Sequence, residues 1–219
     1  MVVIVGFGLS RIAVKNIDIV KEPGGALANI SGNGPKSTLA GISCDNYNSR
    51  PFAVMISSDK EARPLSGISE ADWVFEMPVV DIGFTRMMAV YQCGRPPEIG
   101  SVRSSRLDFV PLALGIDAIY AHFGGEKEAL ARLNSKIIDN IDGLKYDEIY
   151  YYRKKGIPRP HNSFTNFDLL NKVSKELGYN LTDSKVSYMH DADFKNQGNI
   201  SPQPIFNEEF RVVWEFHQD

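Results

Sequence analysis

The chain has 219 residues, of which 43% are hydrophobic and 23% are charged, a composition typical of a globular protein. Its length suggests one large domain, or one domain with extensions. The formal net charge of −3 argues against a domain that binds nucleic acid through a broad basic surface.

The first 49 residues are predicted to be an anchor remnant or linker outside the main domain. The stretch MVVIVGFGLSRIAV is apolar but short, and Arg11 interrupts it, so it cannot span a bilayer as it stands. We interpret it as the tail of a longer anchor or as a first strand. Residues 21–50 are rich in Gly, Ser, Asn and Pro, which is typical of a linker.

Cys44 and Cys93 are the two cysteines of the chain, and their spacing matches no metal-ligand pattern such as Cys-x-x-Cys. A disulfide between them and two unrelated thiols both agree with this count. The count alone favours two unrelated thiols.

Strands and helices alternate from residue 50 onward. Strands are predicted at 51–57, 71–79, 85–92, 117–123 and 147–153, helices at 104–116, 125–135 and 163–179, and a final strand at 208–216. This order predicts an α/β main domain over 50–206, a three-layer-like sandwich in which helices flank a mixed central β-sheet. Residues 207–219 are then a final strand or the start of a truncated C-terminal domain.

Boundary signals support two of these helices. Pro111 is expected to bend the helix at 104–116 or to mark its boundary. Thr165 or Asn166 is expected to cap the helix at 163–179, and Gly178 to end it.

The loop after the first core strand contains Arg63 and Ser66, and Arg86 opens a later strand. Between them, Asp72 and Glu76 could orient an arginine or bind a metal ion. The simpler interpretation is that both acids, and the arginine at the strand start, are ordinary surface residues.

The segment IGSVRSSRLDF, residues 99–109, places Arg103 and Arg106 around Ser104 and Ser105. If these residues form a first helical turn, both guanidinium groups can point the same way, next to the free N–H groups of a helix N-terminus. Such a group would bind a phosphate or a carboxylate. An ordinary capped helix with two surface arginines is the alternative.

The segment AHFGGEKEAL places His122 at the end of a strand and Gly124 and Gly125 in the turn before a helix. Ligands of α/β proteins bind at the carboxyl ends of strands, in this kind of layout. A tight turn with a structural histidine explains the pattern equally well.

The most basic stretch is RKKGIPRPHNSF, with Arg153, Lys154, Lys155 and Arg159. His161 and Asn162 follow, just before a predicted helix start. A solvated loop with a helix cap is the alternative. Because these four regions all lie at strand-to-loop junctions, they would form one anion pocket if the junctions share an edge of the sheet.

Five segments, taken in this order, resemble the YerB-like lipoproteins, a bacterial family built on a domain of unknown function. They are RPFAVMISSDKEARPLSGISEADWVFE, GFTRMMAVYQ, IGSVRSSRLDF, AHFGGEKEAL and PRPHNSF, and the resemblance runs from about Arg50 to Leu170. It implies a membrane-anchored protein on the outer side of the cytoplasmic membrane, and no established reaction. The sequence departs from the family in SSDK, where members usually have an Asp-Asn-His-like run, and it stops where a smaller C-terminal domain would begin.

A weaker likeness in layout is to the LytR-CpsA-Psr phosphotransferases, carried by the order of a strand, ARP, a strand, a Val-x-x-Arg turn and then an aromatic residue, His and Gly-Gly. Those enzymes transfer glycopolymers from a polyprenyl-pyrophosphate carrier and hold the pyrophosphate with arginines and carboxylates, often with Mg²⁺. The likeness is an analogy of layout.

Three functions follow as hypotheses. The first is an extracytoplasmic enzyme of phosphoryl or glycosyl-phosphate transfer, with arginines on the phosphates, Asp72 or Glu76 on a cation or acting as base, and His122 or His161 as acid or base. The second is a non-catalytic module that binds an anionic wall polymer. The third is a structural or assembly lipoprotein whose arginines are buried against Asp72, Glu76 and Asp108.

We expect an anion-binding extracytoplasmic domain, with enzyme status left open. Its catalytic candidates are His122, His161 and Asp72. Its ligand-binding candidates are Arg63, Ser66, Arg86, Arg103, Ser104, Arg106, Gly124, Gly125 and Asn162. The expected partners are an anionic small molecule or cell-wall polymer and, through an anchor missing from this chain, the membrane, but not nucleic acid; the cofactor is left open, and a divalent cation such as Mg²⁺ is compatible.

Overall fold

A computed structural model describes residues 34–79, 84–182 and 184–188. The strands are β1 (Phe52–Ser57), β2 (Trp73–Pro78), β3 (Thr85–Tyr91), β4 (Ile99–Gly100), β5 (Ile119–His122), β6 (Asn140–Asp142), β7 (Tyr152–Arg153) and β8 (Ser163–Thr165). The α-helices are α1 (Phe109–Gly115), α2 (Lys127–Asn134) and α3 (Phe167–Glu176). The final strand predicted at 208–216 and the apolar stretch around Arg11 lie outside the described residues.

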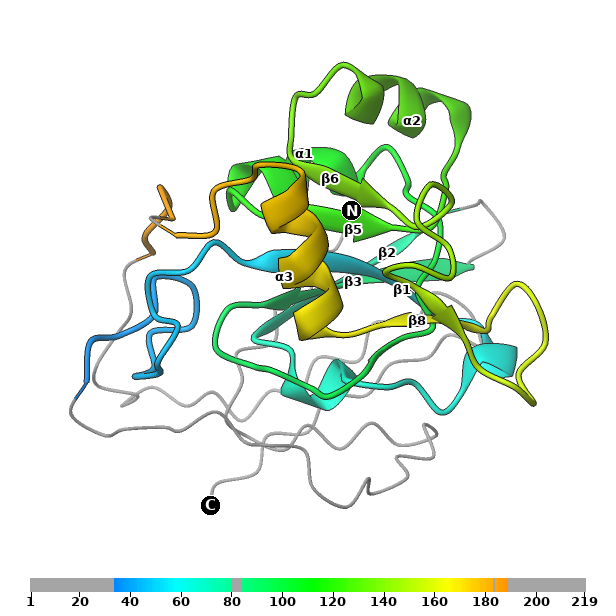
Figure 1. The fold of residues 1–219 in the computed structure, drawn as a ribbon, viewed down its shortest axis with the longest axis horizontal. Helices are drawn as coiled ribbons and strands as arrows, with labels where there is room; N and C mark the ends of the chain where they lie inside the picture. The colour runs from blue at the N-terminus through cyan, green and yellow to red at the C-terminus, as the bar shows by residue number, and fades with distance from the viewer. Residues whose placement is uncertain (1–33, 80–83, 183, 189–219) are drawn as a thin grey trace.

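The central sheet has five strands in the order β2-β3-β1-β5-β6. β1 pairs antiparallel with β3 and parallel with β5, so the sheet is mixed, as predicted. The sequence of β1, FAVMIS, is apolar almost throughout and fully buried, which fits a central strand covered on both faces. In Figure 1, α3 crosses in front of this sheet.

Helices cover both faces of the central sheet, which confirms the predicted α/β sandwich. On one face, Phe109 of α1 and Leu133 of α2 pack with Met55. On the other face, Leu170 of α3 packs with Val54 and Ile141. Strands β1, β2, β3 and β5 therefore supply alternate residues to two separate cores, which explains their largely apolar sequences.

A second sheet of three short strands, in the order β4-β8-β7, was not predicted. The predicted strand at 147–153 is only Tyr152–Arg153, and the predicted helix at 163–179 starts with strand β8 before α3 begins. Asn166 does cap α3, since its side chain accepts a hydrogen bond from the Leu169 N–H, and Gly178 follows the helix with a φ of 72°.

The helix predicted at 104–116 begins only at Phe109, so Arg103 and Arg106 do not lie in a helical turn. The Arg103 N–H donates to the Met55 carbonyl, and the Ser105 N–H donates to the Gly124 carbonyl. These long-range bonds hold the segment extended beside β1 and the β5–α2 turn. Pro111 occupies the first turn of α1, where it is tolerated, and so marks a boundary as expected.

Cys44 and Cys93 form a disulfide, which corrects the preference for two unrelated thiols. The segment that it attaches is part of the folded domain, because Leu39 is 3% exposed and its N–H donates to the Gln92 side chain. The packed domain thus extends upstream of Arg50, where the sequence predicted a linker. Among the described residues, no helix is both long and apolar enough to cross a bilayer.

Candidate functional site

Asp59, just past the end of β1, is the centre of a charged cluster. Its Oδ2 accepts hydrogen bonds from Ser57 Oγ at 2.7 Å and from Arg86 Nη1 at 3.0 Å. The same oxygen lies 3.6 Å from Arg103 Nη2 and 3.8 Å from His161 Nδ1. We call Asp59, Arg86, Arg103 and His161 the Asp59 cluster.

Three connections of the backbone bring this cluster together. Arg86 stands opposite Ser57 in the antiparallel β1–β3 register. Residue 103 is bonded to β1 through its N–H, and the Val102 N–H donates to the Ser163 carbonyl, which brings the loop with His161 alongside. The strand-to-loop junctions at 57–67, 100–106 and 153–162 therefore meet at the Asp59 cluster, while the fourth junction grouped with them in the sequence, 122–125, contributes no member to it.

Within the Asp59 cluster two guanidinium groups, those of Arg86 and Arg103, share one carboxylate, while Arg106 nearby has its own partner in Glu126 at 3.9 Å. Burial lowers the pKa of Arg86, against the opposing effect of Asp59, and burial and the neighbouring Arg86 both lower the pKa of Arg103. The guanidinium of Arg106 is close enough to lower the pKa of both. Burial would raise the pKa of Asp59, but the Ser57 hydrogen bond and the two arginines outweigh it and lower the pKa.

Some polar atoms of the cluster are shielded from solvent and have no hydrogen-bond partner among the described residues. They are Arg86 Nε, Arg103 Nε and His161 Nδ1. Burial and the charge of Arg103 lower the pKa of His161, which disfavours a further positive charge there. Shielded donors of this kind are costly unless an acceptor satisfies them.

A cavity of about 150 Å³ opens beside the cluster. Its lining residues are Val102, Arg103, Ser104, Phe123, Arg153, Arg159 and Pro160. Arg103 belongs to both the cavity and the cluster. A solvent-accessible space next to the arginines is not expected of a purely internal salt-bridge network, so it counts against the third hypothesis.

Asp72 does not join the cluster. Its Oδ2 accepts hydrogen bonds from the backbone N–H groups of Gln92, Cys93 and Gly94. These residues follow β3, so Asp72 lies at one end of the β2–β3 pair and Arg86 lies toward the other end. Burial raises the pKa of Asp72, although these hydrogen bonds oppose the shift. Its carboxylate has a structural role in the hairpin.

His122 does not join the cluster either, and its side chain is buried. Nδ1 lies 2.8 Å from the Gly124 carbonyl, and Nε2 lies 3.3 Å from Asn140 Oδ1. Burial lowers the pKa of His122 more than the nearby Asp142 raises it, which favours the neutral ring. The alternative interpretation of a tight turn with a structural histidine describes this region.

The remaining predicted residues divide into three groups. Arg106 lies near the cluster, and its Nη1 donates to the Ser105 carbonyl. Arg63 and Glu76 form the second group, because each makes a hydrogen bond outside the cluster. Arg63 donates to the Ser58 carbonyl, and Glu76 accepts from the Thr85 hydroxyl. The members of the third group make hydrogen bonds within the fold. Ser66 donates to Glu98, and Asn162 accepts from Arg153. The Gly124 N–H donates to Asp142, and Gly125 forms an isolated β-bridge with Ser105.

Sequence reasoning missed Asp59, the only carboxylate in the cluster as defined. The run SSDK was read as a departure from the family, and its acid was not considered. The available signal was its position directly after the buried strand β1, because the other candidate segments also lie next to strand ends. Among the described residues, no group of three or more His, Cys, Asp or Glu side chains is arranged to hold a metal ion.

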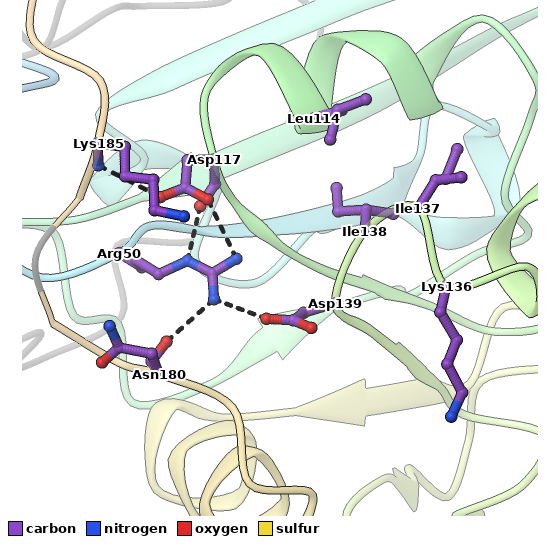
Figure 2. Close-up of a pocket in the computed structure, with 9 residues that line it drawn as sticks. All are labelled: Arg50, Leu114, Asp117, Lys136, Ile137, Ile138, Asp139, Asn180 and Lys185. Atoms are coloured by element: carbon purple, nitrogen blue, oxygen red, sulfur yellow. Dashed lines mark hydrogen bonds and ion pairs between the residues drawn. The ribbon is translucent and has the colours of Figure 1, made fainter.

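Another cavity, of about 220 Å³, lies elsewhere, around Arg50 (Figure 2). Arg50 donates to Asp139 at 2.6 Å and to the Asn180 carbonyl at 3.1 Å, and its Nη2 lies 3.3 Å from Asp117. Two carboxylates thus pair with the Arg50 guanidinium. Arg50 fastens the segment after α3 to the central sheet.

Replacing Arg50 by Met is expected to lower the free energy of unfolding by about 2 kcal/mol, because Asp117 and Asp139 would lose their shared cation. Chemical denaturation followed by circular dichroism measures this. Arg132→Met, on the exposed surface of α2, is the matched control and should change stability by less than about 0.5 kcal/mol. Equal effects of both substitutions would show that Arg50 does not fasten this segment.

Comparison with known proteins identifies the chain's relatives. Residues 39–180 match the family model described as "Protein of unknown function (DUF3048) N-terminal domain". "Putative lipoprotein YerB" of Bacillus subtilis (strain 168) is 36% identical over 148 residues, which cover 67% of this chain and 44% of that protein. The crystal structure of YerB protein from Bacillus subtilis aligns with a TM-score of 0.68 at 33% identity, covering 73% of this chain and 55% of that one.

The chain thus spans about half the length of these relatives. The matched region contains the Asp59 cluster, the cavity beside it and the disulfide. The family model covers more than half of the chain, which confirms the resemblance that the sequence motifs suggested. The chain belongs to the YerB-like family defined by the DUF3048 N-terminal domain.

Proposed function

We propose that this domain binds a phosphate or pyrophosphate group at the Asp59 cluster. The observation that carries the proposal is that Arg86 and Arg103 share a single carboxylate, Asp59, beside a cavity that Arg103 also lines. A phosphate at the edge of that cavity formed by Arg103 would accept charge-assisted hydrogen bonds from its guanidinium and balance the second positive charge.

We place this activity outside the cytoplasmic membrane. A relative is named as a lipoprotein, and the Cys44–Cys93 disulfide would persist in an oxidising compartment but not in the cytosol. Anionic polymers of the cell envelope and small phosphorylated molecules are the ligands available there. We propose binding rather than transfer, since two of the three catalytic candidates, Asp72 and His122, make their hydrogen bonds away from the cluster and only His161 lies in it.

Replacing Arg103 by Gln is expected to weaken the binding of inorganic phosphate and pyrophosphate about 10- to 100-fold, because a charge-assisted hydrogen bond contributes roughly 1.5–3 kcal/mol. Isothermal titration calorimetry at low ionic strength measures this. The affinity of the wild type should itself fall as salt is added.

Arg132→Gln is the matched control, since it removes the same charge from the exposed surface of α2. It should leave the affinity unchanged, and thermal unfolding should show that both variants fold. The proposal fails if the wild type binds neither anion, or if the two variants bind equally well.

A further inference from the structure

The cavity beside the Asp59 cluster has an apolar floor that inorganic phosphate would not use. Phe123, Val102 and Pro160 supply it. The Phe123 ring is held in place, because the Arg153 guanidinium lies 4.3 Å from its centroid and Tyr151 contacts it edge-on. This surface is therefore preorganised for contact with carbon atoms of a ligand.

Arg153 contributes to the cavity as a wall, not as a donor to a ligand. Its Nε and Nη2 donate to the Asp147 carboxylate, and its Nη1 donates to Asn162. These contacts fix the guanidinium over the ring.

Two polar groups of the lining have a different status. Ser104 Oγ and the exposed Arg159 guanidinium make no hydrogen bond or ion pair within the part of the chain that the structure describes. They line the same cavity as Arg103, which carries a shielded, unpartnered Nε. A hydroxyl and a guanidinium at an apolar pocket suit the hydroxyl groups of an organic ligand.

We infer that the ligand of this domain is a sugar phosphate, whose phosphate lies at the Asp59 cluster and whose sugar lies in the cavity between Phe123 and Arg159. This inference rests on the proposed function and specifies its ligand. The cavity, of about 150 Å³, matches a small polyhydroxylated group better than an alkyl chain, which would require a long apolar groove.

The test compares probes with similar phosphate groups: inorganic phosphate, glucose 1-phosphate and octyl phosphate. The wild type should bind glucose 1-phosphate at least about 10-fold more tightly than the other two, because only the sugar can use Ser104 and Arg159. Arg159→Ala should remove most of this gain and change the affinity for inorganic phosphate less than about twofold. Calorimetry provides both affinities.

Lys155→Ala is the matched control, since it removes an equal charge from an exposed position of the same loop that does not line the cavity. It should leave the preference for glucose 1-phosphate intact, and Ser104→Ala should reduce it without a loss of fold. The inference is overturned if inorganic phosphate binds in an Arg103-dependent way but glucose 1-phosphate binds no tighter, if octyl phosphate binds best, or if Arg159→Ala and Lys155→Ala act alike. Absence of binding by all three probes would instead overturn the proposed function.

Discussion

Replacing both Cys44 and Cys93 by Ser is expected to lower the free energy of unfolding by about 4 kcal/mol. The two residues are 49 positions apart, so the disulfide closes a long loop and restricts the unfolded chain strongly. For a domain of this size, the melting temperature should fall by on the order of 10 °C. Urea denaturation of wild type and variant provides the comparison.

The experiment has an internal control. Because the chain contains two cysteines, a thiol assay on the denatured wild type should detect no free thiol before reduction. Reduced wild type should unfold at the same urea concentration as the double variant. Free thiols in the wild type, or equal stability with and without reductant, would contradict the disulfide and remove one support for the extracytoplasmic location.

The long elements could be predicted from sequence because local pattern determines them. The buried run of β1 and the cap and stop signals of α3 act within a few neighbouring residues. Of the small sheet, only β7 lies within a predicted strand; β4 and β8 could not be predicted, because two or three residues carry no readable period. Ile99 becomes part of β4 only because it pairs with Thr165, far along the chain.

The candidate site was predictable in part for the same reason. Arg86, Arg103 and His161 were singled out at strand ends, and the fold does bring them together. Asp59 and Asp72 are both acids next to a strand end, so the sequence alone does not show which of them contacts an arginine. The pairing of β3 with β1 and β2 determines this. It places one carboxylate next to Arg86 and the other at the far end of the hairpin.

The substitution Asp59→Asn tests what this carboxylate does for the cluster. It keeps the shape of the side chain but removes the one negative charge that pairs with Arg86 among the described residues, and the Arg86 side chain is 6% exposed. We expect a loss of about 3 kcal/mol in the free energy of unfolding, because a buried guanidinium would lose its counter-ion. Asp45→Asn, at an exposed position, is the control and should have little effect.

The pH dependence of this loss has a defined sign. The pKa of Asp59 in the folded protein lies below the ordinary aspartate value of 3.8, so its contribution is complete above that value and declines as the pH falls through the lowered pKa. The stability difference between wild type and Asp59→Asn should therefore be constant near neutral pH and shrink in strong acid. A difference that grows as the pH falls would contradict this role.

Phosphate provides the link between this stability effect and function. If the arginines bind an anion, phosphate can replace the missing carboxylate, and the variant should gain more thermal stability from added phosphate than the wild type does. Chloride at equal ionic strength should not reproduce the gain, since it cannot accept several directed hydrogen bonds at once. An equal gain in both proteins would mean that phosphate binds elsewhere and that Asp59 and the anion do not share the arginines.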